Sequence, residues 1–202
     1  MKLFNIFLLL LSLTANATEL TLTKENTVVL SGFIDNRNID GLYFDMAKMA
    51  AKLPKDQPLY VIINTPGGEV QMANEYIDLT SSLNRPVHTV TAMAAGAGFN
   101  VVQGLGKRYV LKDGTFVAFR PSNNAEPHSL EPKLQIELNQ VLEQVKYADQ
   151  IAAKRLGLSL DDYRSLIKDQ HWVSGQNAVV ENFADEVVTV NADKEFENFL
   201  KH

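Results

Sequence analysis

Cysteine is absent from this 202-residue sequence, so the fold must hold together without disulfides. An excess of positive charge is also absent: the formal net charge is −5, whereas a chain that binds phosphates needs a basic face. No repeat or low-complexity stretch occurs, and the histidines and acids lack the spacing of metal ligands. We therefore expect no nucleic-acid partner, no metal and no cofactor.

The first 17 residues differ in character from the rest of the chain. They read MKLFNIFLLLLSLTANA, with Lys2, an apolar run over residues 3–13 and an Ala15-Asn16-Ala17 motif, which is the pattern of a secretory signal. The run is shorter than the about 20 residues that span a bilayer; a retained anchor or a buried first helix is the alternative. We predict a signal peptide over residues 1–17 and an exported protein, periplasmic or secreted. The remaining length allows a single domain, residues 18–202.

Strand-like and helix-like segments alternate along this domain. Continuous apolar runs such as LYVIIN are typical of parallel strands covered on both faces, and apolar residues at helical spacing predict helices. The predicted strands cover residues 26–34, 59–64, 87–92, 108–111 and 115–119, and the predicted helices cover residues 39–53, 72–83 and a small-residue stretch beginning within MAAGAG. Tight turns are expected at TPGG and at Lys112-Asp113-Gly114. The sequence therefore predicts an α/β fold whose site lies at the strand ends, near TPGG and MAAGAG.

A long helix is expected beyond residue 131, with Gly157 as its C-terminal cap. About 25 residues at 1.5 Å each give a length of nearly 40 Å, whereas a domain of this size has a radius of gyration of about 16 Å. The helix either crosses the body as a core helix or projects from it with an apolar stripe that needs a partner. Ser159 and Ser174 are predicted to cap two short helices, and Asn182 to end the second one in a left-handed conformation.

Five segments in order resemble the proteolytic subunit of the Clp protease, within the wider ClpP/crotonase fold. They are TVVLSGFID, LYVIINTPGGEV, TAMAAGAGFN, GKRYVLKDGTFVAFRPS and SGQNAVVENFADEV. The resemblance covers residues 26–190 and implies a βαβ spiral with a long protruding helix and a ring of subunits, possibly a heptamer. It also implies a peptide-binding groove. The stretch SNNAEPHSLEP does not match the glycine-rich segment through which the family's rings stack.

The family's catalytic serine, histidine and aspartate carry over onto Gly96, Phe119 and Gln170. Glycine has no oxygen with which to attack, and phenylalanine cannot accept a proton. No serine or cysteine occurs between Asn84 and Arg120. The resemblance places the oxyanion-binding backbone amides at Gly67 or Gly68 and at Ala97, although these small residues are equally explained by the turn and by close packing.

Other polar side chains are weaker candidates. Arg120 could clamp a carboxylate at the groove edge, His171 could be a displaced base, and Ser122 could be a substitute nucleophile. Lysine bases of the kind used by related signal peptide peptidases would have to come from the long helix, which carries Lys133, Lys146 and Lys154. His88 and His128 are expected to have no catalytic role.

Three functions compete on this evidence. The first is an exported, catalytically silent Clp-like protein that forms a ring and binds peptides or a protein partner. The second is a serine-type peptidase with a rearranged active site. The third is a crotonase-like enzyme acting on a thioester, which is ranked last because coenzyme A is rare outside the cytoplasm. ATP is scarce there too, so an ATP-driven unfoldase is not expected as a partner.

Overall fold

The computed structural model describes residues 18–120 and 132–192. For residues 132–134 it describes the backbone but not the side chains. The predicted signal peptide, Ser122 and His128 lie outside these residues, as does the side chain of Lys133. The elements are β1 (Thr18–Leu22), β2 (Thr27–Ile34), α1 (Asn36–Lys52), β3 (Leu59–Gly68), α2 (Val70–Ser81), β4 (Val87–Ala95), α3 (Ala97–Gly104), β5 (Arg108–Ala118), α4 (Pro132–Leu156), α5 (Leu160–Leu166), β6 (His171–Ser174), α6 (Gly175–Val180) and β7 (Glu186–Ala192). Within the described part of the chain, no helix is both long and apolar enough to cross a membrane.

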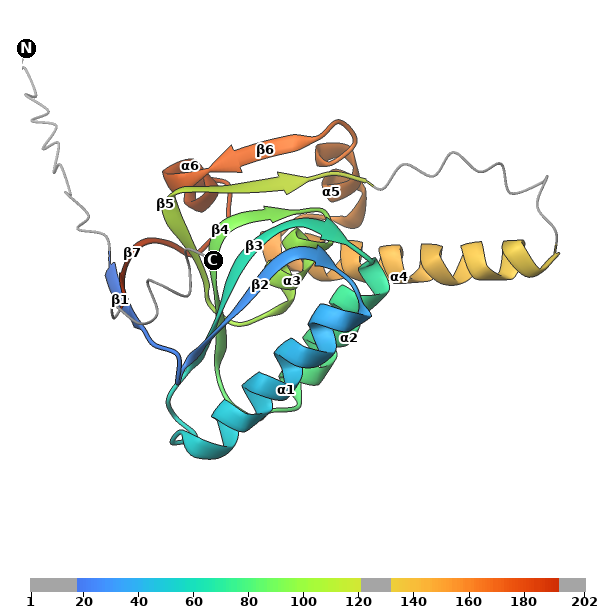
Figure 1. The fold of residues 1–202 in the computed structure, drawn as a ribbon. Helices are drawn as coiled ribbons and strands as arrows, with labels where there is room; N and C mark the ends of the chain where they lie inside the picture. The colour runs from blue at the N-terminus through green and yellow to red at the C-terminus, as the bar shows by residue number, and fades with distance from the viewer. Residues whose placement is uncertain (1–17, 121–131, 193–202) are drawn as a thin grey trace, which may run out of the picture.

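The strands form one seven-stranded sheet in the order β1-β7-β5-β4-β3-β2, and all neighbours along this path are parallel. β6 pairs with β5 in the antiparallel direction, off the main path. Helices connect β2 to β3, β3 to β4 and β4 to β5, as βαβ crossovers require (Figure 1). The predicted α/β class is confirmed.

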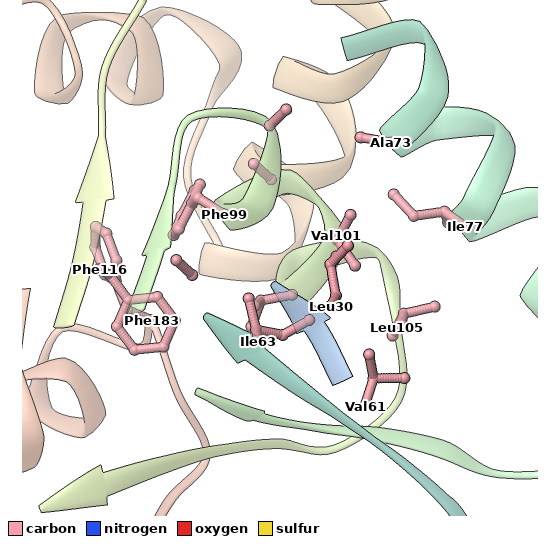
Figure 2. Close-up of a cluster of buried hydrophobic side chains, with 14 of the residues drawn as sticks. Leu30, Val61, Ile63, Ala73, Ile77, Phe99, Val101, Leu105, Phe116 and Phe183 are labelled. Carbon is pink, nitrogen blue, oxygen red and sulfur yellow. The ribbon is translucent and has the colours of Figure 1, made fainter. Parts of the chain in front are cut away.

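The main core lies between the sheet and its helices (Figure 2). Phe99 on α3, Phe116 on β5 and Phe183 near the C-terminus form its aromatic centre, with ring centroids 5.1–6.2 Å apart. The alternate residues of the central strands, such as Ile62 and Val90, face a smaller cluster on the other side of the sheet. The central strands are therefore buried on both faces, as their continuous apolar runs predict.

Two predicted turns are wrong. TPGG is the end of β3, because Phe33 and Ile34 of β2 pair with Gly67 and Gly68. Lys112-Asp113-Gly114 does not separate two strands: β5 runs without a break, and its register against β4 shifts between Thr91 and Met93. This irregularity requires glycine at position 114, since a Cβ there would lie 2.3 Å from the main-chain oxygen of Thr91.

The predicted helix ends are mostly confirmed. Gly157 and Asn182 have φ values of 75° and 60°, and the Ser159 side chain accepts a hydrogen bond from the N–H of Asp162 at 3.1 Å. Ser174 occupies the N-cap position of α6 but its side chain makes no capping hydrogen bond. The expected cap by Ser174 is therefore wrong in its chemistry.

The long helix α4 spans 25 residues and extends well beyond the rest of the body (Figure 1). Its C-terminal part is anchored by Ala148, Ala152 and Ala153, which are buried in the core. Its N-terminal part carries exposed apolar side chains, including Val141 at 53% and Leu142 at 48% exposure. The apolar stripe thus continues from the body into solvent. Of the two arrangements considered from the sequence, a core helix or a projecting helix, the structure shows the projecting helix.

Candidate functional site

A pocket of about 80 Å³ lies at the C-terminal ends of β3 and β4 and beyond the end of β5. Its rim includes Gly67, Gly68, Gly96, Ala97 and Phe119, which come from the segments that the sequence singled out. Its remaining walls come from β3, α2 and α3 on one hand and from α4 and α5 on the other. The fold therefore brings the predicted groove residues together with two of the three triad-equivalent positions.

The turn from β4 into α3 is centred on Gly96. Its backbone has φ 51° and ψ −117°, which corresponds to the first central residue of a type II′ turn, a position where glycine is favoured. The N–H of Gly96 donates to the main-chain oxygen of Val117 at 3.0 Å, which ties the turn to β5. A residue at this turn sits between the end of a strand and the N-terminus of a helix, which is where α/β hydrolases hold a nucleophile.

The ring of Phe119 lies against Gly96, on the side where a side chain at position 96 would be. A Cβ added to Gly96 would be 3.0 Å from Phe119 Cζ and 3.4 Å from Cε1. These distances are shorter than the 3.5–4.0 Å of a good carbon–carbon contact. The aromatic ring therefore occupies the space above the turn, and neither residue carries an atom that could attack a carbonyl or move a proton.

Gln170 lies just outside the sheet and does not line the pocket. It directly precedes β6, whose first residue His171 pairs with Ala118 in antiparallel register, one position before Phe119. Gln170 is exposed. This position carries an uncharged amide.

The backbone donors are only partly available. The N–H of Gly67 donates to Thr65 Oγ1 at 3.0 Å, so this predicted oxyanion donor already has a partner. Gly68 packs against β2, where a Cβ would lie 2.3 Å from the Ile34 oxygen. Ala97 is the first residue of α3, and helices leave the N–H groups of their first turn without intrahelical partners. Gly96 has no side chain to cap them, so this helix end is the better donor of the two.

The other candidates lie outside the pocket. Arg120 is exposed and is not a lining residue, and its role as a clamp at the groove edge stays a prediction. His171 Nε2 lies 2.6 Å from Glu181 Oε2 and the ring packs on Phe183, which explains the residue without catalysis. Burial lowers the pKa of His88, and its Nδ1 accepts the N–H of Lys107 at 3.0 Å.

Asp149 and Tyr163 line the pocket and were not singled out from the sequence. Asp149 is on α4, and its carboxylate accepts from Arg164 Nε at 3.0 Å. Burial raises the pKa of Tyr163, and the negative charge of Asp149 adds to this effect. One signal was available: Asp149 follows Val145 by four residues, so an acid occurs within the apolar stripe of the long helix.

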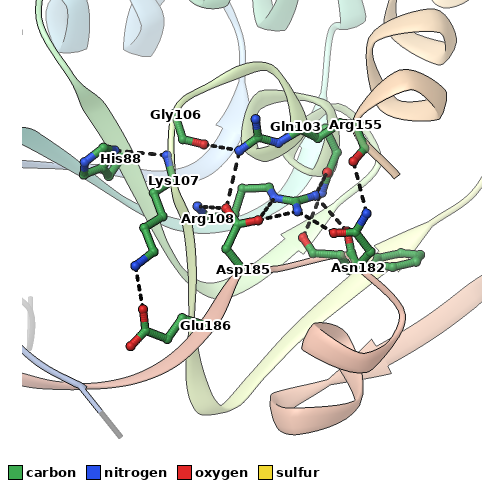
Figure 3. A network of polar contacts seen from close by, with 10 residues as sticks. His88, Gln103, Gly106, Lys107, Arg108, Arg155, Asn182, Asp185 and Glu186 are labelled. Atoms are coloured by element: carbon green, nitrogen blue, oxygen red, sulfur yellow. Dashed lines mark hydrogen bonds and ion pairs between the residues drawn. The ribbon is translucent and has the colours of Figure 1, made fainter. Parts of the chain in front are cut away.

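A second polar cluster lies away from the pocket and has a structural role (Figure 3). Arg108 is 2% exposed. Its guanidinium donates to Gln103 Oε1 at 2.7 Å, to the main-chain oxygen of Asn182 at 2.8 Å and to Asp185 Oδ1 at 2.5 Å. Burial alone would raise the pKa of Asp185, but the hydrogen bonds and charge of Arg108, with Arg155, outweigh it and lower the pKa. Among the described residues, no group of histidines and acids is placed to hold a metal.

Comparison with known proteins agrees with the predicted resemblance. A family model described as Clp protease matches residues 14–191. The ATP-dependent Clp protease proteolytic subunit of Lactococcus lactis subsp. cremoris is 23% identical over 176 residues, covering 86% of this chain and 88% of the relative. The subunit of the same description from Streptococcus gordonii is 21% identical over 173 residues, covering 84% and 88%.

Proposed function

Because this chain belongs to the Clp protease family, we propose that it is an exported member that assembles with itself and binds peptides without cleaving them. The observation that carries the proposal is the contact between Phe119 and Gly96. In the family's mechanism these positions would supply the attacking oxygen and the base that takes its proton. Loss of one such residue costs roughly a million-fold in turnover in the subtilisin example, so the loss of both leaves no peptidase of the standard design.

Peptide binding is supported by what the pocket retains. The first turn of α3 offers N–H groups beginning with that of Ala97, and the partial positive charge of a helix N-terminus favours a carbonyl oxygen or a carboxylate. Apolar side chains of Val70 and Val145 lie beside it. Such a combination suits a bound peptide backbone better than a thioester.

Self-assembly is supported by large apolar side chains left in solvent. They occur on the protruding part of α4, as described above, and on other elements: Phe33 on β2 and Phe44 on α1 are 68% and 61% exposed, and Trp172 on β6 and Val180 on α6 are 64% and 77% exposed. Apolar side chains on different elements of one subunit allow head-to-tail contacts, which close into a ring where the rotation between subunits permits it. The assembly we propose is a single ring, with the seven subunits that the resemblance implies.

Export is supported by the sequence of residues 1–17 alone, which combines Lys2, an apolar run over residues 3–13 and the Ala15-Asn16-Ala17 motif. Outside the cytoplasm ATP is scarce, so we propose that no ATP-driven unfoldase feeds this protein.

Three measurements on the purified protein test the proposal together. A panel of fluorogenic peptides should show no turnover, a serine-reactive fluorophosphonate should leave the chain unlabelled, and the mass in solution should be a multiple of the subunit mass. Labelling that disappears in a Ser122→Ala variant would establish a rearranged peptidase instead. A monomer at micromolar concentration would remove the assembly part of the proposal.

A further inference from the structure

Asp149 supplies the only charged side chain among the described residues that line the pocket. Its side chain is 8% exposed, and a carboxylate at this depth needs compensation of its charge. Arg164 provides part of it from α5 through one contact, Nε to Oδ2 at 3.0 Å. Arg164 does not line the pocket, so Asp149 is a charged lining residue without a cationic side chain beside it in the lining.

The other polar side chains of the lining are uncharged. Burial raises the pKa of Tyr163 and keeps its phenol neutral, and Asn100 carries an amide, so both can accept as well as donate hydrogen bonds. The apolar part of the lining consists of Val70, Val145 and the ring of Phe119. The pocket thus combines apolar walls and the N–H donors at the start of α3 with one anionic side chain, Asp149.

We propose that this pocket binds a lysine side chain of a peptide, with the ammonium group at Asp149 and the aliphatic stem against Val70, Val145 and Phe119. The inference rests on the proposed peptide binding and names the residue type that the groove selects. Lysine has three N–H donors and no acceptor, so its ammonium group suits a carboxylate oxygen. Arg164 already contacts Oδ2 of Asp149, so the two-oxygen contact that the planar guanidinium of arginine prefers is not available, whereas an ammonium group needs one oxygen.

The test compares three short fluorescent peptides that differ at one position, which is lysine, norleucine or arginine. Norleucine keeps an aliphatic stem and removes the ammonium group. Binding to the purified protein is followed by fluorescence anisotropy, and the bound peptides are checked for cleavage by mass spectrometry. We expect the lysine peptide to bind about tenfold more tightly than the norleucine peptide, and its advantage to shrink at high salt.

Two matched variants assign the effect to the pocket. Asp149→Asn should reduce the affinity for the lysine peptide to that of the norleucine peptide. Asp161→Asn changes the net charge equally but alters an exposed acid on α5, so it should leave the preference intact. Thermal unfolding of both variants shows whether they fold, and the comparison of lysine with norleucine on the unaltered protein depends on neither.

Each outcome decides at least one of the two proposals. Equal affinity for the lysine and norleucine peptides, or tighter binding of arginine, would overturn lysine selection and leave peptide binding standing. Failure of all three peptides to bind would overturn peptide binding and lysine selection with it. Cleavage of the peptides with a preference for lysine would support the pocket assignment and overturn the silent role.

Discussion

Replacement of Gly96 by alanine should be unusually costly, for two separable reasons. The backbone at this residue, with φ 51° and ψ −117°, lies in a region that L-residues avoid, and such strain costs roughly 1–3 kcal/mol. The new Cβ would also be 3.0 Å from Phe119 Cζ, and relief of this contact by movement of the ring costs about 1 kcal/mol more. We expect Gly96→Ala to lower the free energy of unfolding by about 2–4 kcal/mol in total.

Two other glycines serve as matched controls. At Gly157 φ is 75° and a Cβ would meet nothing within 4 Å, so Gly157→Ala carries backbone strain alone and should cost about 1 kcal/mol. Gly41 lies within α1 and also has open space, without a positive φ, so Gly41→Ala should stabilise by about 0.5–1 kcal/mol.

The steric part is isolated by a double-mutant cycle with Phe119→Ala. Removal of the ring should reduce the cost of Gly96→Ala by about 1 kcal/mol and leave the backbone strain in place. Urea unfolding followed by far-ultraviolet circular dichroism is the suitable assay, since the single tryptophan, Trp172, is 64% exposed and would report little. All variants need the same protein concentration, because self-association adds to stability. Equal costs for Gly96→Ala in both backgrounds would refute the placement of the ring against the turn.

Three further predictions concern other parts of the molecule. Asp185→Asn removes the carboxylate that compensates the buried Arg108 and should cost about 3 kcal/mol in urea unfolding; a loss below 1 kcal/mol would contradict the network. Burial lowers the pKa of His88 in the folded state, so below about pH 6.5 the unfolded chain takes up a proton that the folded chain does not, and the free energy of unfolding should fall as the pH drops. His88→Asn should flatten the dependence of this free energy on pH between pH 7.5 and about 5.5, and an unchanged dependence would exclude His88 as its source. Leu142→Asp on the exposed stripe of α4 should weaken self-association in sedimentation velocity without lowering monomer stability, whereas Gln140→Asp, also exposed on α4, should have little effect.

The sequence predicted the sheet better than it predicted the site. LYVIIN and VHTVTA were recognisable as strands because both faces of the central sheet are covered, and the α/β class followed from this pattern. The turn at TPGG was wrong because glycines and proline usually interrupt strands, whereas here the chain continues to pair with β2 as far as Gly68. Local residue preference could not reveal that pairing, since it depends on a partner strand distant in the sequence.

The site itself was half predictable. The resemblance located Gly96 and Phe119, but only the folded chain shows that the ring fills the space above the glycine. Asp149 was missed because its position depends on how α4 docks on α2, α3 and α5, which the helical repeat alone does not determine. Thr65 was missed for a similar reason: its hydroxyl reaches the N–H of Gly67 only in the conformation that the end of β3 adopts.

The close approach of Phe119 to Gly96 also couples the two positions in any redesign of this surface. A larger residue at position 96 meets the ring, so it is accommodated more easily once position 119 has become smaller. Placing a hydroxyl above this turn therefore calls for two coordinated substitutions.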